Sequence, residues 1–270
     1  MVVVGDHAGL FGRGTVGEGC DRDDLELPGV QRRLVEEVLG TGTPVVLVLL
    51  TGRPYAVGWA LGRCAAVVQA FFPGEEGGPA VAGVLSGRVN PSGRLPVSIP
   101  RPAGAQPYSY LPPPRGGDGE VTNLSSAAAL PFGHGLSYTT FEHGAVEVLD
   151  ARTATGVVVE VTVTNTGERA GAEVVQLYGR DVHASVTRPV AQLLGYHRLE
   201  LEPGASATVR LTVPPARLAF TGRDGRRVVE PGELRLWTGT PADGGRATET
   251  ELAGAVREVT VADERWTRVG

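Results

Sequence analysis

Acidic side chains are concentrated in one glycine-rich segment, FGRGTVGEGCDRDDLELPG, at residues 11–29. Glu18 stands between two glycines, and Asp21 and Arg22 follow shortly after it. Flanking glycines allow backbone and substrate to approach a carboxyl group closely, and a mobile loop can carry that group to a leaving-group oxygen. Glu18 is therefore a candidate proton donor, although the same pattern is typical of a solvated glutamate in a polar turn.

The same segment contains GRGTVG, residues 12–17, which matches the G-x-G-x-x-G dinucleotide pattern. In that fingerprint the first glycine follows a strand directly and the third opens a helix, whose N-terminus binds the pyrophosphate. Here Gly12 comes eight positions after Val4, where the expected strand ends, and no helical pattern begins before Pro28. The match therefore does not indicate a nucleotide site, and a chain without lysine has no Walker-type phosphate loop.

Other catalytic and metal-binding patterns are missing from the sequence. It contains no His-Glu-x-x-His pair, no Cys-x-x-Cys pair and no Gly-x-Ser-x-Gly elbow. Asp21, Asp23 and Asp24 lack the spacing of a calcium loop and are expected to be solvated turn residues. We expect neither a cofactor nor a bound metal.

Net charge and hydrophobic pattern argue against some partners and locations of the protein. The net charge of -5 argues against a nucleic-acid partner, because neutralising phosphates needs a concentrated basic face. No apolar run is long enough to span a membrane, so no membrane partner is expected. No signal peptide is visible, which predicts a cytoplasmic location, but Met1 leads almost directly into VVVGD. A chain that begins inside a strand can have lost upstream sequence, and a signal with it.

The first hundred residues alternate short apolar runs with helical patterns, which predicts a parallel sheet covered by helices. The helix expected at 28–39 places Val30, Leu34 and Val38 on one face. The runs at 44–51 and 65–72 are continuous, as in strands buried on both faces. The remaining expected elements are strands at 2–4 and 95–100 and helices around 55–61 and 77–87.

Two further regions complete the chain, and the expected domains are 1–100, a connecting segment at 101–144, and 145–270. The connecting segment is rich in Pro and Gly, and it either straps the domains together or lines an entrance with Tyr108 and Tyr110. In 156–167, Val157, Val159, Val161 and Val163 alternate with polar or exposed positions, which predicts a half-buried antiparallel strand. About seven short strands in the last region favour an immunoglobulin-like β-sandwich.

Several of these segments, taken in order, resemble glycoside hydrolase family three, whose best-known members are β-glucosidases. The matching stretches are GEGCDRDDLELPGVQRRLVEEV, PVVLVLLTGRPYAV, QAFFPGEEGGPAVAGVLSGRVNPSGRLPVSIPR, LPFGHGLSYTTFEH, VTVTNTGERAGAEVVQLYGRD and VTRPVAQLLGYHRLELEPGASATVRLTV. The resemblance implies an α/β fold followed by an all-β fold. The first part is a partial αβα sandwich with a mostly parallel sheet, and the second is a fibronectin type III-like β-sandwich.

The resemblance also implies roles. In the family, a nucleophilic aspartate on an N-terminal barrel attacks the sugar, while a glutamate on a loop of the α/β domain acts as general acid/base. Glu18 occupies that place, and Asp21 and Arg22 are expected to shape the loop or touch the sugar. The alternative for this pair is a surface salt bridge of little energetic value. Retaining hydrolysis of this kind sets two carboxyl groups about 5–5.5 Å apart.

The chain departs from the family pattern in two places. Residues 1–270 include no barrel, and they are expected to lack the first strands of the α/β domain. Gly87-Arg88 also stands where the family more often has Gly-Asp. The expected partners are therefore a β-glycoside or oligosaccharide substrate and a barrel domain, in cis or in trans, that carries the nucleophile. Alone, the chain is expected to be inactive. Two alternatives stay open: a non-catalytic carbohydrate- or protein-binding module, and a degraded fragment.

Overall fold

The computed structural model describes residues 1–102, 104, 109–114, 116, 118, 120, 122–241 and 247–260. The chain forms two compact units. The first comprises Met1–Val89, Pro96–Ser109 and Gly117–Phe132, and the second comprises Asn90–Leu95, Tyr110–Gly116 and Gly133–Gly270. The residues treated above as one connecting segment, 101–144, are thus divided between the units. Tyr108, one of the two tyrosines expected to line an entrance, lies outside the described residues.

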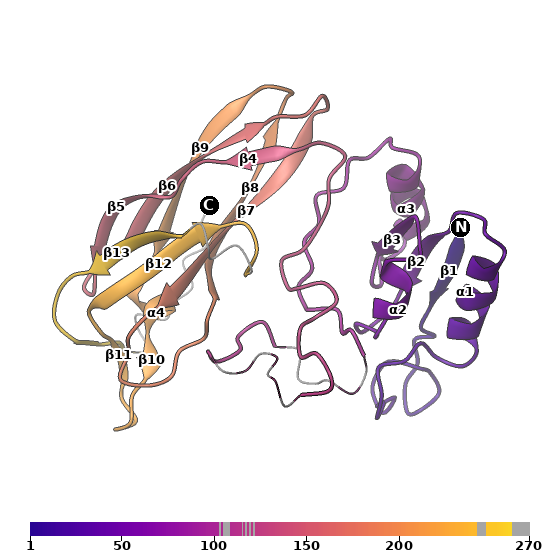
Figure 1. The fold of residues 1–270 in the computed structure, drawn as a ribbon, viewed down its shortest axis with the longest axis horizontal. Coiled ribbons are helices and arrows are strands. Elements are labelled where there is room, and N and C mark those ends of the chain that lie inside the picture. Colours follow the sequence, from indigo (N-terminus) through magenta and orange to yellow (C-terminus); the bar gives the residue numbers. More distant parts are fainter. Residues whose placement is uncertain are drawn as a thin grey trace. The chain divides into compact units, whose positions relative to one another are not determined.

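The first unit is built on a parallel three-stranded sheet with the order β1-β2-β3. Its strands are β1 (Val2–Gly5), β2 (Val46–Leu50) and β3 (Ala66–Gln69), and its helices are α1 (Gln31–Gly40), α2 (Gly58–Leu61) and α3 (Gly77–Leu85). Strands and helices alternate along the chain, and Figure 1 shows α1 beside β1, with which it is in contact. This arrangement confirms the expected α/β class for the first part of the chain.

Burial in this sheet follows the position of each strand. β2 is the central strand, and its residues Leu47, Val48 and Leu49 are almost completely buried, as its continuous apolar run predicts. β3 is an outer strand and is only partly buried, so the expectation of a strand buried on both faces at 65–72 is wrong. An outer strand lacks a neighbour to cover one of its edges, and its side chains keep part of their contact with solvent.

Two further expectations for this unit are wrong. On α1 the buried side chain is Val35, whereas Val30 and Leu34 are exposed. The helix is thus turned about its axis relative to the expected orientation. Gln31 accounts for this, because its side-chain amide accepts a hydrogen bond from the Gly5 N–H and donates one to the Gly5 carbonyl, both at 2.7 Å. In place of a strand at 95–100, the structure has only an isolated antiparallel bridge between Ile99 and Leu130. Prolines at both ends of this stretch disfavour a longer ladder.

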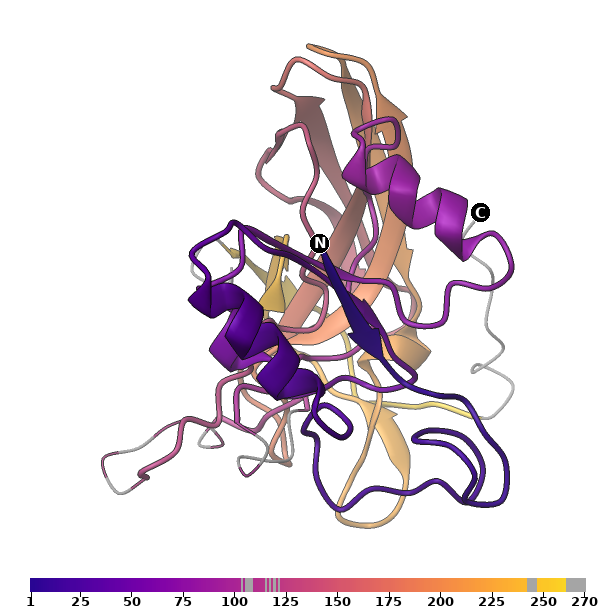
Figure 2. The same ribbon diagram turned by 90° about the vertical axis from the view of Figure 1, so that its right-hand side faces the viewer.

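The second unit is an antiparallel β-sandwich, which confirms the expected all-β class (Figures 1 and 2). One sheet has the order β13-β12-β7-β8, and in the other β6 pairs with β4, β5 and β9; a small third sheet has the order β10-β11-β14. The elements are β4 (Phe141–His143), β5 (Glu147–Arg152), β6 (Gly156–Asn165), β7 (Gly171–Asp181), β8 (Gln192–Leu201), β9 (Ser206–Val213), α4 (Pro215–Leu218), β10 (Phe220–Thr221), β11 (Arg227–Val229), β12 (Gly232–Thr238), β13 (Thr248–Leu252) and β14 (Arg257–Glu258).

The core of the second unit lies between the two larger sheets. The predicted alternation in β6 is confirmed, because its four odd-numbered valines, from Val157 to Val163, are fully or almost fully buried. Leu177 of β7, Leu211 of β9 and Leu236 of β12 pack into the same cluster. Side chains from both inner faces therefore fill one continuous apolar layer.

The Asn-Pro-Ser-Gly-Arg-Leu stretch at residues 90–95 belongs to this second unit, and we call it the strap. The side chain of Asn90, the first residue of the strap, anchors the strap to the β-sandwich. The Asn90 Oδ1 atom accepts hydrogen bonds from the Ser137 hydroxyl at 3.0 Å and the Tyr138 N–H at 2.7 Å. Its Nδ2 atom donates to the Ala170 carbonyl at 3.1 Å. An asparagine that satisfies both ends of its amide in this way fixes the path of the backbone around it.

Candidate functional site

Glu18 lies in the loop between β1 and α1, and this loop folds back on itself. Its two arms, residues 7–11 and 15–18, are joined by backbone hydrogen bonds of 2.8–3.0 Å, from Gly9 N to Val16 O, from Phe11 N to Glu18 O and from Thr15 N to His7 O. A further bond of 3.0 Å from Cys20 N to Gly17 O closes a turn with Glu18 at its second position. Glu18 therefore stands on an internally bonded loop.

The glycines of this loop are required by its own packing. Gly17 has φ +120°, and a Cβ placed on it would lie 1.9 Å from the Gly9 carbonyl oxygen. A Cβ on Gly9 would lie 2.5 Å from the Gly14 nitrogen. Gly19, at the third position of the turn, has the positive φ that a type II turn needs. The two arms can approach each other only because these positions lack side chains.

Asp6, the residue after β1, anchors the base of the loop. Its Oδ1 atom accepts hydrogen bonds from the Thr15 hydroxyl, at 2.6 Å, and from the Tyr55 hydroxyl, and its Oδ2 atom accepts one from the Gly52 N–H at 2.9 Å. Burial and the hydrogen bond to Asp6 raise the pKa of Tyr55. Asp6 thus joins the end of β1, the second arm of the loop and the segment after β2.

Arg53 fixes the loop from the other side. Its Nη2 atom donates to the carbonyl of Thr15 at 3.2 Å and to the carbonyl of Cys20 at 2.9 Å. These two carbonyls lie on either side of Glu18 in the sequence. One guanidinium group therefore holds both ends of the short segment that carries the candidate proton donor, through charge-assisted hydrogen bonds.

The three residues singled out from the sequence all lie in this loop. Glu18, Asp21 and Arg22 are exposed. In the described part of the chain, no residue forms a hydrogen bond or an ion pair with the Glu18 carboxylate, and no ion pair joins Asp21 to Arg22. The arrangement is an exposed carboxyl group on an anchored loop, and it can donate or accept a proton at a surface placed against it.

Among the described residues, no group of three or more His, Cys, Asp or Glu side chains is arranged to hold a metal ion. The same residues include no helix that is long and apolar enough to cross a membrane. For the dinucleotide pattern at 12–17, the next helix along the chain is α1, which begins at Gln31. The loop after Gly17 therefore does not open a helix at whose N-terminus a pyrophosphate could bind.

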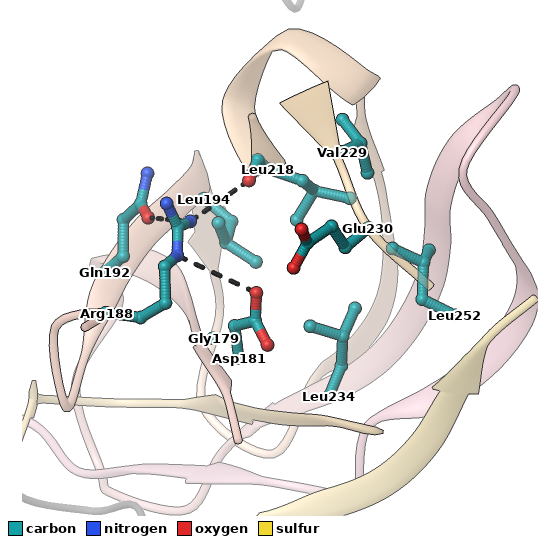
Figure 3. A pocket seen from close by; sticks show the side chains of 10 residues that line it. All are labelled: Gly179, Asp181, Arg188, Gln192, Leu194, Leu218, Val229, Glu230, Leu234 and Leu252. Atoms are coloured by element: carbon teal, nitrogen blue, oxygen red, sulfur yellow. Dashed lines mark hydrogen bonds and ion pairs between the residues drawn. The ribbon is translucent and has the colours of Figure 1, made fainter. Parts of the chain in front are cut away.

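The second unit contains a small cavity of about 20 Å³ that is lined by both charged and aliphatic side chains (Figure 3). Arg188 lies at its edge, with its Nε atom 3.7 Å from Asp181 Oδ2 and its Nη2 atom donating to the Leu218 carbonyl at 3.0 Å. Burial raises the pKa of Asp181 and lowers that of Arg188. The cavity has room for about one water molecule, whereas small-molecule sites usually measure roughly 300–1,000 Å³. It is too small to hold a sugar.

Comparison with known proteins assigns the chain to a family. Residues 1–138 match the glycosyl hydrolase family 3 C-terminal domain, and residues 173–242 match the fibronectin type III-like domain. The chain belongs to glycosyl hydrolase family 3. The α/β unit, which carries Glu18, lies in the first match. The second match covers the part of the β-sandwich from β7 to β12.

Individual relatives support the family assignment. The chain is 40% identical over 230 residues to a β-xylosidase of Formosa agariphila and 38% identical over 251 residues to a periplasmic β-glucosidase of Salmonella typhimurium. These matches cover 83% and 88% of this chain but only 32% of either relative. The chain therefore spans about a third of the length of these curated relatives.

Solved structures of two β-glucosidases have the same fold over the matched region. A β-glucosidase of Erythrobacter marinus matches with a TM-score of 0.78 and 42% identity, over 86% of this chain and 31% of that protein. A β-glucosidase of Listeria innocua in complex with glucose matches with a TM-score of 0.82 and 30% identity, over 94% of this chain and 36% of that protein.

The side chains that hold the loop, Asp6, Arg53 and Tyr55, were not among the site residues predicted from the sequence. Asp6 follows a strand directly, and polar residues at the carboxyl ends of parallel strands are a usable signal because such ends meet at one edge of a sheet. Arg53 and Tyr55 gave no comparable signal. Tyr55 is 49 positions from its partner Asp6 along the chain.

Proposed function

We propose that this chain is the part of a retaining β-glycosidase that supplies the general acid/base, Glu18, for the hydrolysis of terminal β-glycosides. The nucleophile comes from a barrel domain, in cis or in trans. Glu18 protonates the glycosidic oxygen as the nucleophile attacks the anomeric carbon, and it then removes a proton from the water that releases the sugar. The chain alone is inactive, because it provides one carboxyl group of the pair.

One observation carries this proposal: the Glu18 carboxylate is exposed and has no partner among the described residues, while its backbone is held by Arg53 and the turn at Gly17. A carboxyl group without a partner on an anchored backbone has a fixed starting position and is free to meet a substrate. Positioning a catalytic group within about 0.5 Å requires support of this kind from surrounding residues. Relatives named β-glucosidases and β-xylosidases are consistent with a β-glycoside substrate.

The test joins this chain to the part of the Erythrobacter marinus β-glucosidase that precedes the matched region. Hydrolysis is measured with aryl and alkyl β-glucosides and β-xylosides. Glu18→Gln should lower kcat/KM by about 10²–10⁴-fold for alkyl glycosides, whose poor leaving groups need protonation. Dinitrophenyl glycosides, which have a good leaving group, should lose much less.

Asp23→Asn is the matched control, because Asp23 is an exposed carboxylate of the same loop. It should leave both activities near those of the parent protein. If Glu18→Gln retains full activity on alkyl glycosides in an assembly that Asp23→Asn leaves active, the acid/base assignment is wrong. If the folded assembly hydrolyses nothing, the chain is a binding module rather than a part of an enzyme.

A further inference from the structure

Two large apolar side chains are exposed next to Glu18. Leu10 is 57% exposed and Phe11 is 78% exposed, and both lie at the end of the first arm of the loop. Two adjacent apolar side chains with this exposure offer a surface that another apolar group can cover. The other apolar side chains of the two arms, Ala8 and Val16, are less prominent, because one is a single methyl group and the other is half-buried. Leu10 and Phe11 therefore form a local apolar platform.

The backbone holds Phe11 in an unusual conformation. Phe11 has φ +54°, and in the described chain only Phe71 shares a positive φ among residues other than glycine. A bulky residue in this region of conformational space is strained, at a cost of order 1–3 kcal/mol, and such residues cluster at functional sites. A glycine would fit without strain, so the presence of phenylalanine points to a use for the ring.

Phe11 is also directly paired with the candidate acid/base. The Phe11 N–H donates to the Glu18 carbonyl at 2.8 Å, and a Cβ on Gly19 would lie 3.4 Å from the Phe11 Cα. The ring and the Glu18 carboxylate therefore extend from backbone positions that touch each other.

We propose that Phe11, with Leu10 beside it, is the binding platform for the leaving group of the substrate, and that it favours glycosides whose aglycone is flat and apolar. This inference rests on the proposed function of Glu18, because the leaving group is the part of the substrate that the proton donor meets. An aromatic ring attracts flat apolar groups by stacking and offers no polar atom of its own. The platform therefore selects the aglycone and leaves the sugar ring to other residues.

The test measures binding and avoids proton transfer. The protein is the assembled enzyme described above, carrying Glu18→Gln, and the probes are phenyl and methyl 1-thio-β-glucosides. Phe11→Gly removes the ring and suits the positive φ, so folding is preserved, while Phe11→Tyr keeps an aromatic ring. Phe11→Gly should weaken binding of the phenyl probe by about tenfold and that of the methyl probe by less than about twofold, whereas Phe11→Tyr stays near the parent.

Arg13→Ala, an exposed residue of the same loop, should change neither dissociation constant. If Phe11→Gly weakens the binding of both probes equally, the ring packs against protein and the proposal is wrong. If it weakens the binding of neither, the ring contacts nothing in the complex and the proposal is also wrong. The Erythrobacter marinus enzyme carrying residues 7–20 of this chain gives a second measurement of how much more tightly the phenyl probe binds than the methyl probe. Failure of the acid/base assignment appears separately, as full hydrolysis by the Glu18→Gln variant.

Discussion

The Arg53 guanidinium donates a 2.9 Å hydrogen bond to the Cys20 carbonyl, and the same Nη2 atom reaches the Thr15 carbonyl at 3.2 Å. Arg53→Met removes both bonds and keeps much of the side-chain volume. A hydrogen bond from a charged donor contributes about 1.5–3 kcal/mol, so amide exchange in the loop should accelerate by about tenfold or more. Native-state hydrogen exchange of the Phe11 and Cys20 amides measures this, with β2 amides as the internal reference.

Arg63→Met is the matched control, because Arg63 is exposed and lies just after α2 in the same unit. It should leave the loop amides at the parent rate. Equal acceleration of the β2 amides and the loop amides in Arg53→Met would contradict a local role, since it would show that the whole unit had been destabilised.

Asp6→Asn should change the titration of Tyr55. Burial and the hydrogen bond to Asp6 raise the pKa of Tyr55, so loss of the Asp6 charge should let the phenol ionise at a lower pH. Alkaline absorbance titration measures this, with Tyr55→Phe subtracted to isolate the one phenol. An unchanged Tyr55 titration would show that Asp6 contributes nothing to the shift.

The same shift predicts how stability depends on alkaline pH. Because the folded-state pKa of Tyr55 is raised, the folded unit holds this proton more tightly than the unfolded chain does. The stabilising contribution of the protonated Tyr55 is therefore fully present below the unfolded-state pKa of about 10, and it is lost as pH rises above that value. Tyr55→Phe should remove this part of the alkaline loss, and denaturant unfolding at pH 8 and pH 11 tests it.

Strong periodicity made part of the fold predictable from the sequence. The alternating valines of β6 and the continuous apolar run of β2 each bury the expected side chains, because regular patterns match regular elements. The face of α1 was not predictable, since it depends on the amide of Gln31 bonding to Gly5, which lies 26 positions away. The strap was not predictable either, because its path is set by bonds from Asn90 to residues of the β-sandwich.

Some residues of the candidate site could likewise be predicted from the sequence, and others could not. Glu18 could be found because its flanking glycines and following residues form a recognisable local pattern. Asp6 gave a weaker signal, its place directly after a strand, and Arg53 gave none, because its partners in the loop are set by backbone geometry. In particular, the close approach of Gly9 and Gly17 leaves no periodic signal in the sequence.

Gly17→Ala should open the loop. Its new Cβ would lie 1.9 Å from the Gly9 carbonyl oxygen, so the two arms must separate. Gly29→Ala is the matched control, because Gly29 also has a positive φ, +60°, but has nothing within 4 Å of the new Cβ. The control should cost only the conformational strain of about 1–2 kcal/mol. Similar loop exchange rates for the two variants would show that the Gly9 contact is unimportant.

Arg94→Met should destabilise the second unit strongly. Arg94, in the strap, donates a 2.6 Å hydrogen bond to Glu173, whose side chain is only 9% exposed. Removing Arg94 takes away the charged partner of a buried carboxylate and leaves it, in the described part of the chain, with only His143, whose Nε2 atom lies 3.5 Å from Glu173 Oε1. Breaking a buried pair in this way costs up to about 3–5 kcal/mol. Adding Glu173→Gln should recover part of the loss, and exchange of buried β7 amides measures both variants. Arg198→Met, which breaks an exposed pair with Glu200, should cost about 1 kcal/mol or less.

His134 should make the second unit sensitive to mild acid. Burial, together with the nearby positive charge of Arg94, lowers the pKa of His134 in the folded chain. As pH falls, the unfolded chain therefore binds the proton before the folded chain does. The contribution of neutral His134 to the free energy of unfolding is fully present above about pH 6.5 and is lost as pH falls below that value. In His134→Gln the free energy of unfolding should change less between pH 8 and pH 5 than in the parent. The difference between the two proteins at pH 8, where both side chains are neutral, isolates the packing effect of the substitution. Parallel curves from pH 8 to pH 5 would show that another group causes the acid sensitivity.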